Sequence, residues 1–402
     1  MTKTMSPWQF SLFRIIFGSY LAVHFAMLIP YANELFGASG LIGDPSLNLT
    51  AGLFPNPLNL PLPSAALPWI AGGLAALSVA FAAGWLRPLV SICLWLGWTA
   101  LFHRNNLIGN PSIPYVGLLL LLCALVPTGE PLALAKRDDR WAMPKWVFRC
   151  AWILLAAGYS FSGYTKMFSP SWVDGSAMTF LLENPLARPG PVRDLMLALP
   201  SGILKGLTWF TLAAELAFLP LALWNKSRPW IWLSMVALHL GILVVVDFAD
   251  LSFGMLMIHL FTFDPAWLPA RARNRVTLAY DGECLMCSGF IRFLAAEDRG
   301  RLLGFVTLQS KAGDEMRKRA GESHLSSMVV ERDGEVFSKS GAFLVLLSAL
   351  GGHWRVLSLF GSIIPKRLRD GVYLFVAKRR YQWFGKQTMC ALPSAEVAER
   401  IS

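Results

Sequence analysis

The sequence is poor in charged residues, and the scarcity is uneven along the chain. Only 15% of the 402 residues are charged and 55% are hydrophobic, whereas soluble globular proteins carry about 25% charged residues. The apolar excess lies almost entirely before residue 270, in runs such as LAVHFAMLI and VGLLLLLCALV. A helix that crosses the hydrocarbon layer needs about 20 apolar residues. The composition therefore predicts a polytopic membrane protein with a more polar C-terminal part.

The sequence also lacks a dense cysteine framework, internal repeats and low-complexity segments. It has six cysteines, and Cys93, Cys123 and Cys150 lie in apolar runs, where we expect packing thiols. No small-residue cleavage site follows the first apolar run, so we interpret this run as a retained span rather than a removed signal peptide.

The net charge of +11 does not indicate that the protein binds nucleic acid. The basic residues cluster at the ends of apolar segments and in the C-terminal part, as in loops that face anionic lipid. The predicted partner is therefore membrane lipid.

Eight spans are predicted from length and flanking residues. They lie near 8–30, 65–86, 88–103, 113–128, 146–166, 203–224, 229–247 and 249–266. Residues 31–64 contain no lysine or arginine, whereas basic residues crowd alternate loops, at Arg87, Lys136, Arg137, Arg140, Lys145, Lys226, Arg228, Arg271, Arg273 and Arg275. This alternation predicts that both termini are cytoplasmic, as in a protein of the bacterial inner membrane.

From residue 276 the hydrophobic pattern changes to that of an α/β domain. RVTLAY and LLGFVTL are typical of strands, and helices are predicted after CLMC, at DEMRKRA and near 366–384. SSMVVERDGEVFSK predicts a hairpin whose turn is Asp333-Gly334. GAFLVLLSAL is about half as long as a membrane span, which predicts a buried helix. The order is that of a small layered α/β domain.

Cys284 and Cys287 form a CxxC pair between a predicted strand and a predicted helix. A helix N-terminus presents unpaired N–H groups and a partial positive charge, which favour the reactive thiolate. We expect Cys284 to lie nearer the exposed end as the nucleophile and Cys287 to resolve the mixed disulfide. Two alternatives stay open: inert core thiols, and a zinc site that adds Cys390 with His324 or His353.

YDGECLMCSGFIRFLAAEDRGRLLGFVTLQS resembles the opening of the putative thiol-disulfide oxidoreductase DCC family, and the stretch ending in RRYQWFGKQTMC resembles its closing half. The resemblance covers about residues 276–395. It implies a thioredoxin-like domain whose redox-active disulfide is Cys284–Cys287 and in which Asp281 belongs to the motif. Cys390 matches a cysteine often present at the end of the family sequence.

No proline lies between Pro269 and Pro365. Thioredoxin-like folds usually place a cis-proline opposite the CxxC pair, before a strand. We therefore expect substrate handling that differs from that of thioredoxin.

Ionisable residues within predicted spans are costly, which makes them functional candidates. His24, Lys166, Glu215, His239 and His259 are such residues. About residues 8–268, most clearly GYTKMFSPSWVDGSAM and the stretch from 224 to 261, resemble the membrane domain of vitamin K-dependent gamma-carboxylases. In bacterial relatives this domain is known as the horizontally transferred transmembrane domain. The resemblance places Lys166 on the lysine taken as the catalytic base and His239 on a histidine of the membrane core. It implies a pocket for a quinone-like or other lipid-soluble molecule.

The predicted fold is thus a polytopic α-helical membrane bundle, residues 1–268, followed by a small α/β thioredoxin-like domain, residues 276–395. The predicted function is a membrane-bound thiol-disulfide oxidoreductase, of the protein-disulfide reductase type, that acts on protein thiols and disulfides. Its catalytic residues are Cys284, Cys287, Lys166 and His239. A carboxylase-like enzyme acting on a quinol, and a non-catalytic maturation factor for an exported protein, are the alternatives. No metal and no oligomeric state are predicted.

Overall fold

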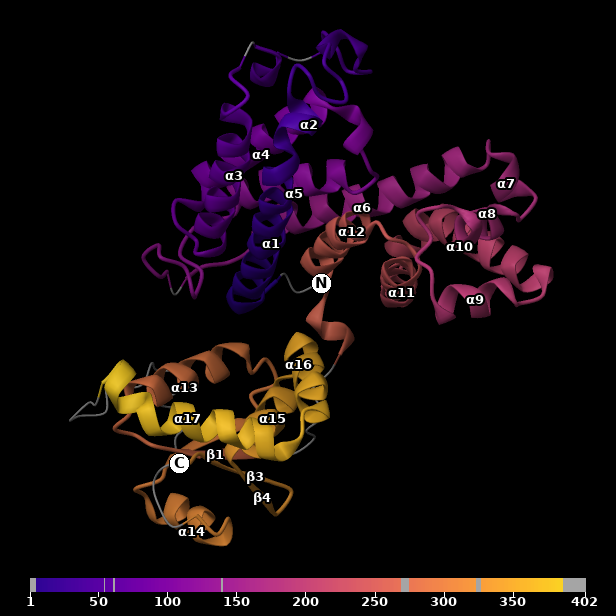
Figure 1. Cartoon of the computed structure of the whole chain (residues 1–402). Coiled ribbons are helices and arrows are strands. Elements are labelled where there is room, and N and C mark those ends of the chain that lie inside the picture. The colour runs from indigo at the N-terminus through magenta and orange to yellow at the C-terminus, as the bar shows by residue number, and fades with distance from the viewer. Residues whose placement is uncertain are drawn as a thin grey trace. The chain divides into compact units, whose positions relative to one another are not determined.

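The computed structural model describes residues 5–53, 55–60, 62–138, 140–268, 275–322 and 327–385. The chain forms two compact units that meet in sequence between Phe263 and Asp264. The first unit is helical, and the second combines helices with a sheet (Figure 1).

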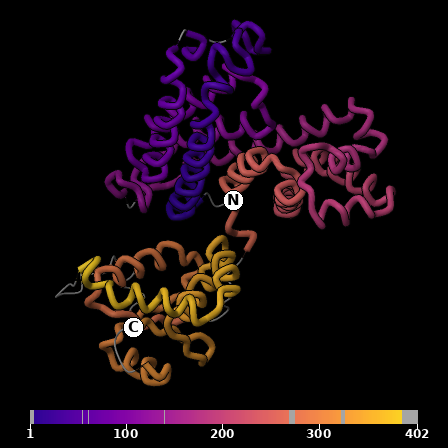
Figure 2. Tube along the Cα trace, in the orientation of Figure 1, coloured from indigo at the N-terminus to yellow at the C-terminus, as the bar shows by residue number. Residues whose placement is uncertain are grey.

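The first unit is a bundle whose last helix lies centrally. Its helices are α1 (Pro7–Leu28), α2 (Ala32–Phe36), α3 (Ala66–Ala82), α4 (Arg87–Arg104), α5 (Ile113–Leu125), α6 (Lys145–Lys166), α7 (Pro170–Val173), α8 (Ala177–Glu183), α9 (Pro191–Leu197), α10 (Ser201–Leu223), α11 (Arg228–Val245) and α12 (Ala249–Thr262). Helix α12 contacts α1 and α5 as well as α6 and α11, so it joins the N-terminal helices to the later ones (Figure 2).

All eight predicted spans coincide with helices, but not all of these helices are long enough to cross a membrane. By length and composition, three helical segments of the described chain are sufficient: Pro7–Phe36, Ser201–Leu223 and Arg228–Val245. Ala66–Ala82, Ile113–Leu125 and Ala249–Thr262 are apolar but shorter. At 1.5 Å per residue, α5 and α12 fall short of a hydrocarbon layer about 30 Å thick. The prediction of eight spans therefore holds for helix positions, and three helical segments have both the length and the composition of a span.

A proline inside α10 is accommodated by a hydroxyl from α6. Pro220 has no N–H to donate to the carbonyl of Leu216. Ser160 Oγ donates to that carbonyl at 3.1 Å and accepts from the Leu219 N–H at 3.0 Å. The α6–α10 interface thereby satisfies the backbone groups that the proline leaves open, which is a requirement in an apolar environment.

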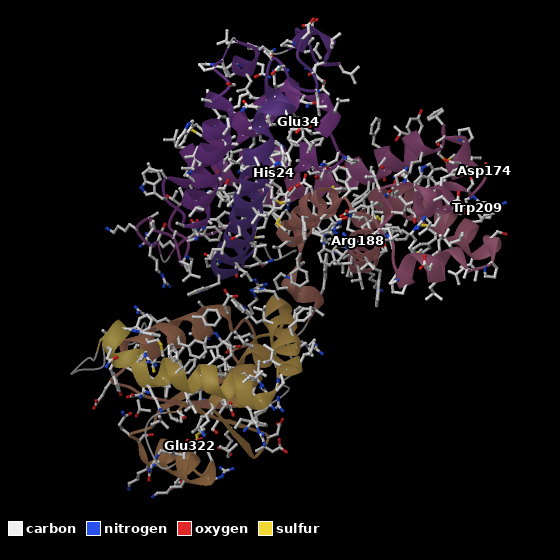
Figure 3. The ribbon with its side chains drawn as sticks, viewed as in Figure 1. His24, Glu34, Asp174, Arg188, Trp209 and Glu322 are labelled. Carbon is white, nitrogen blue, oxygen red and sulfur yellow. The ribbon has the colours of Figure 1, made fainter. Side chains whose placement is uncertain are left out.

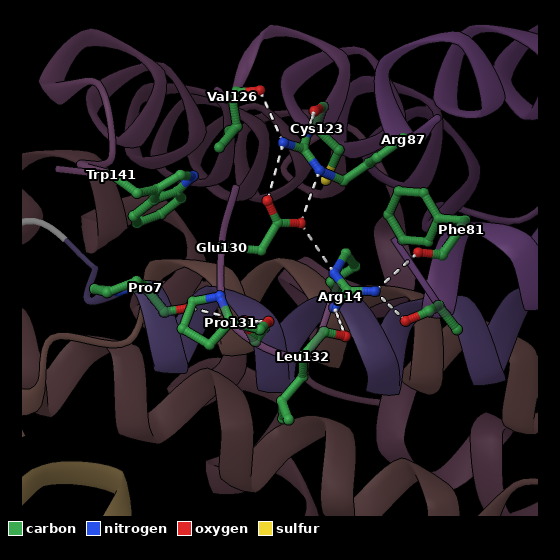
Figure 4. Close-up of polar contacts among 12 residues, drawn as sticks. Pro7, Arg14, Phe81, Arg87, Cys123, Val126, Glu130, Pro131, Leu132 and Trp141 are labelled. Carbon is green, nitrogen blue, oxygen red and sulfur yellow. Dashed lines mark hydrogen bonds and ion pairs between the residues drawn. The ribbon is translucent and has the colours of Figure 1, made fainter. Parts of the chain in front are cut away.

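Three buried charges of the first unit form an ion-pair cluster (Figure 4). Glu130 Oε1 lies 3.1 Å from Arg14 Nε and 3.0 Å from Arg87 Nε, and both arginines are fully buried. Arg14 also donates to the Leu132 carbonyl at 2.8 Å, and Arg87 donates to the Val126 carbonyl at 2.9 Å. The interpretation of Arg87 as an exposed loop cation is therefore wrong, because the side chain turns inward to Glu130. The predicted cytoplasmic orientation loses this residue as support and stays a prediction.

The second unit begins with a short 3₁₀ turn, Pro265–Trp267, and contains one four-stranded sheet. Its elements are β1 (Val276–Tyr280), α13 (Leu285–Glu297), β2 (Leu303–Thr307), α14 (Lys311–Arg319), β3 (Val329–Arg332), β4 (Glu335–Ser338), α15 (Lys339–Leu350), α16 (Gly352–Ile363) and α17 (Lys366–Phe384). The strand order is β2-β1-β3-β4, with β1 parallel to β2 and the other pairs antiparallel. This small α/β arrangement is consistent with a thioredoxin-like domain.

The local predictions in this unit are confirmed, with one helix added. Asp333 (φ +53°) and Gly334 (φ +83°) form the hairpin turn between β3 and β4, as two positive φ values in a two-residue hairpin turn require. Helix α15 is the predicted buried apolar helix, with Leu346 fully buried. Helix α16 was not predicted. Helices α13, α15 and α17 lie on one side of the sheet and α14 on the other (Figure 1), where α14 packs over Ala279 and Val306.

Candidate functional site

The CxxC pair lies where the first strand passes into the first helix of the second unit. Cys284 is the N-cap residue of α13, in an extended conformation, and Cys287 lies in the first turn. Both are free cysteines, and their side chains hydrogen-bond to each other. The expectation that Cys284 lies at the exposed end is wrong: Cys284 is 0% exposed, whereas Cys287 is partly exposed. Cys287 is thus the more accessible of the two sulfur atoms in the structure.

Asp281 connects the CxxC loop to the last helix. Its Oδ2 accepts from Arg380 Nη2 at 2.8 Å and from the Tyr381 hydroxyl. Its Oδ1 accepts from Gln309 Nε2 at 3.1 Å and from the Glu283 N–H at 3.2 Å. Asp281 and Arg380 are 4% and 6% exposed. Four donors from three parts of the chain therefore converge on one buried carboxylate beside the cysteines.

The charges around the pair act on its acidity in opposite directions. Burial raises the pKa of Cys287 well above the ordinary thiol value, and the hydrogen bond with Cys284 raises it further, while the Arg380 guanidinium opposes this rise. Burial also raises the pKa of Asp281, but the bonds from Tyr381 and Arg380 outweigh it, so the net pKa is below the usual value. The structure thus holds Asp281 as a carboxylate and Cys287 as a thiol at neutral pH.

The segment that leads into β3 is joined to α17 by a hydrogen bond. Met328 directly precedes β3, and its backbone N–H donates to the Tyr373 hydroxyl of α17 at 3.0 Å. Tyr373 interacts electrostatically with Cys287, and burial raises its pKa to about 12. No peptide bond is cis within the described ranges. The Tyr373 hydroxyl of α17 thus accepts a hydrogen bond from the backbone N–H of the residue before β3.

Zinc finds no complete ligand set in the residues that the structure describes. Within these residues, no group of three or more His, Cys, Asp or Glu side chains lies close enough together to hold a metal ion. His353 lies in α16 against Trp354, with ring centroids 4.3 Å apart. Cys390 and His324 lie outside the described residues, so their predicted contributions stay predictions.

Residues 278–386 match the DCC1-like thiol-disulfide oxidoreductase family. The uncharacterized protein YuxK of Bacillus subtilis (strain 168) is 41% identical to this chain over 130 residues, which is 32% of this chain and 93% of that protein. The chain belongs to this family. The chloroplastic DCC family protein At1g52590 of Arabidopsis thaliana is 32% identical over 121 residues, 30% of this chain and 70% of that protein. No solved structure matches.

The structure brings the opening and the ending of the DCC1-like region of this chain to one carboxylate. Asp281 comes from the Asp-Gly-x-Cys-x-x-Cys opening, and Arg380 and Tyr381 come from the Arg-Tyr-x-x-Phe-Gly ending, 99 and 100 residues later. Sequence reasoning singled out Asp281 but gave no role to Arg380, Tyr381, Gln309 or Tyr373. The quoted Arg-Tyr ending was the available signal for the first two. Nothing local marks Gln309 and Tyr373.

Lys166 of the first unit lies at the C-terminal end of α6, bound to a carboxylate. Its Nζ donates to Glu215 Oε1 at 2.7 Å and to Ser162 Oγ at 2.9 Å, and lies 4.9 Å from the Trp172 ring centroid. An ammonium group held in an ion pair carries the proton that a base must first lose. The role of Lys166 as a base stays a prediction.

His239 belongs to a buried polar cluster that is separate from the contacts of Lys166. The Tyr159 hydroxyl lies 2.9 Å from His239 Nε2 and 2.8 Å from His259 Nε2. One hydroxyl carries one proton, so it donates to one imidazole and accepts from the other. Two neutral rings that share one hydroxyl in this way hold opposite tautomers. In the part of the chain that the structure describes, Nδ1 of each ring is buried without a hydrogen-bond partner.

His24, labelled in Figure 3, belongs to a separate cluster on the N-terminal side of the bundle. Its Nδ1 lies 2.8 Å from Asp250 Oδ1, which also accepts from the Tyr20 hydroxyl at 2.8 Å. Asn110 donates to Asp250 Oδ2 at 3.2 Å. The predicted ionisable residues of the bundle therefore divide into at least two clusters. The resemblance to gamma-carboxylases gains no support from the family match, which begins at residue 278, and stays a prediction.

Proposed function

We propose that this chain is a membrane-bound thiol-disulfide oxidoreductase that reduces disulfides through Cys284 and Cys287. The observation that carries the proposal is the contact between the two thiols at the N-terminus of α13, inside a DCC1-like domain. The backbone N–H groups of the first helical turn favour negative charge on a sulfur placed there and so offset part of the effect of burial on Cys287. The three helical segments with the dimensions of a span support the membrane location.

The exposure of the two side chains supports Cys287 as the attacking residue. Its thiolate attacks one sulfur of the substrate disulfide, the substrate S–S bond breaks, and the leaving thiolate takes up a proton. The Cys284 thiolate then attacks Cys287 Sγ and displaces the second substrate thiol. The substrate gains two electrons and two protons, and the pair becomes a disulfide. A dithiol reductant returns the pair to its starting state.

The raised pKa of Cys287 supports the reducing direction. A dithiol whose thiolate is stabilised is a strong oxidant when oxidised, because its reduced form is favoured. Burial of Cys287 acts in the opposite sense by disfavouring the thiolate. Burial is the largest of the effects on Cys287, and it favours the pair as a donor of electrons to disulfides.

The test is disulfide reduction by the full chain in detergent, with insulin as substrate and dithiothreitol as reductant. We expect the double substitution C284S/C287S to lower the rate above background at least about a hundredfold, because both sulfur atoms take part in the exchange. The matched control is C93S/C150S, which removes two thiols of the first unit. An unchanged rate in C284S/C287S would overturn the proposed function.

We propose a second candidate, an activity of the first unit on a lipid-soluble quinol, because of the unpartnered imidazole nitrogens beside Tyr159. Two buried rings that share one hydroxyl and each leave Nδ1 free can pass a proton to or from a ligand hydroxyl. Lys166 and Glu215 supply a charged pair from the contacting helices α6 and α10.

Binding of a short-chain naphthoquinol to the full chain in nanodiscs, measured by equilibrium dialysis, tests this second candidate. We expect His239→Leu and Lys166→Ala each to weaken binding at least about tenfold, the loss typical of one hydrogen bond to a charged or buried partner. Lys205→Ala in α10 is the matched control. Equal binding by all four proteins would exclude the site.

A further inference from the structure

Helix α17 has two faces with different tasks. Tyr373, Ala377 and Arg380 face the interior of the second unit, where Arg380 reaches Asp281. The opposite face carries large apolar side chains at the spacing of one helical face. These are Leu368 (64% exposed), Val372 (66%), Phe375 (51%) and Trp383 (52%). The helix thus turns one face to the redox site and leaves a continuous apolar stripe exposed.

The apolar stripe continues through the turn that precedes α17. Leu359, Phe360 and Ile363 at the end of α16 and Ile364 in the turn are exposed, with Ile363 at 76%. We call these four residues, together with the four of α17, the outer α16–α17 face. Scattered single apolar residues on a surface are ordinary, whereas a contiguous set of this kind marks an interaction site.

The charges around this face are almost all positive. Between residues 352 and 385 the chain has seven lysines and arginines and one carboxylate, Asp370. Asp370 is turned to Ser340 and Lys366. Arg379 Cζ lies 3.9 Å from the Phe375 ring centroid, and the Phe375 and Trp383 rings are 5.8 Å apart. Aromatic rings interleaved with arginine and flanked by lysine are typical of helices that lie in the plane of a membrane interface.

We propose that the outer α16–α17 face binds the surface of an anionic lipid bilayer. The apolar side chains enter the boundary between headgroups and acyl chains, while Lys366, Arg367, Lys378 and Arg379 extend their charged ends to the phosphates. The charge favours anionic over zwitterionic lipid. This inference is independent of the redox chemistry, since it uses only the outward side chains.

Binding in this way has a consequence for the DCC1-like domain. Arg380 and Tyr381 lie on the same helix as the outer face and hold the CxxC loop through Asp281. The cysteine pair is therefore kept within one helix diameter, about 10 Å, of the lipid surface. Disulfides close to the membrane would meet the pair before those in bulk solution.

Photo-crosslinking of the full chain in nanodiscs tests the proposal. A benzophenone amino acid replaces Val372, or Glu315 of α14 as the control position, and mass spectrometry identifies the crosslinked partner. The nanodiscs contain either phosphatidylcholine alone or a mixture with about one third phosphatidylglycerol, whose negative charge attracts lysine and arginine. We expect lipid adducts at position 372 and not at 315, with a higher yield in the anionic nanodiscs.

Charge reversal distinguishes lipid binding from other partners. We expect R367E/K378E to lower the adduct yield at least about tenfold, because each cation near an anionic surface contributes a factor of about five to binding. R301E/K318E makes the same change in net charge elsewhere on the unit and should leave the yield unchanged. Adducts of position 372 with residues of the first unit, with a second copy of the chain, or with no partner would each overturn the proposal.

Discussion

Cys284→Ser accumulates a mixed disulfide between Cys287 and the substrate, whereas Cys287→Ser accumulates at least about tenfold less. The reason is access: Cys284 has no exposed surface, so Cys287 is the sulfur that a substrate disulfide reaches. A resolving cysteine that is missing leaves the mixed disulfide unresolved. The measurement is the mass of the covalent product formed by the full chain with a disulfide-containing peptide, separated without reductant.

The pH dependence of this trapping provides an internal control. Because burial raises the pKa of Cys287, the thiolate fraction in Cys284→Ser remains small at neutral pH. It should grow about tenfold for each pH unit between pH 7 and pH 9, without reaching a plateau. If Cys287→Ser traps substrate and Cys284→Ser does not, Cys284 attacks first, and an opening of the site must precede the reaction.

Asp281→Asn loosens α17 from the CxxC loop. The substitution removes the carboxylate that accepts from Arg380, Tyr381 and Gln309, and leaves the Arg380 charge buried without its partner. Removing one member of a buried ion pair costs about 3 kcal/mol, so amide hydrogen exchange in α17 should accelerate about a hundredfold. Hydrogen exchange of the full chain, followed by mass spectrometry of the α13 and α17 peptides, measures this effect.

Two further observations belong to this experiment. Asp333→Asn changes a carboxylate in the exposed hairpin turn, where asparagine also accepts the positive φ of +53°. This variant should leave exchange in α17 unchanged.

The Asp281 pKa lies below its usual value. The contribution of Asp281 to stability is therefore complete above about pH 4 and is lost as the pH falls through the lower, folded-state pKa. Equal exchange in Asp281→Asn and the parent chain at pH 7 would show that the ion pair does not hold α17.

The features predicted correctly from sequence depend on nearby residues. The alternation in RVTLAY, the Asp333-Gly334 turn and the apolar run of GAFLVLLSAL each specify a strand, a turn or a helix within a few residues, because side-chain period and backbone φ are local properties. The eight helices of the first unit that coincide with predicted spans follow from the same kind of pattern. Their interpretation as eight spans is supported by length and composition for three helical segments and stays a prediction for the others, of which α5 and α12 are shorter than a span.

What the sequence by itself determined is the family of the C-terminal part, the order of its elements and the position of the CxxC pair at a helix start. The tertiary structure decided which cysteine is accessible, that Asp281 binds Arg380, that Lys166 binds Glu215, and that Arg14 and Arg87 are buried on Glu130. These partners lie 43 to 116 residues apart in sequence. Hydropathy and periodicity do not predict which distant charges pair. Burial and ion pairing arise only when separate elements pack together.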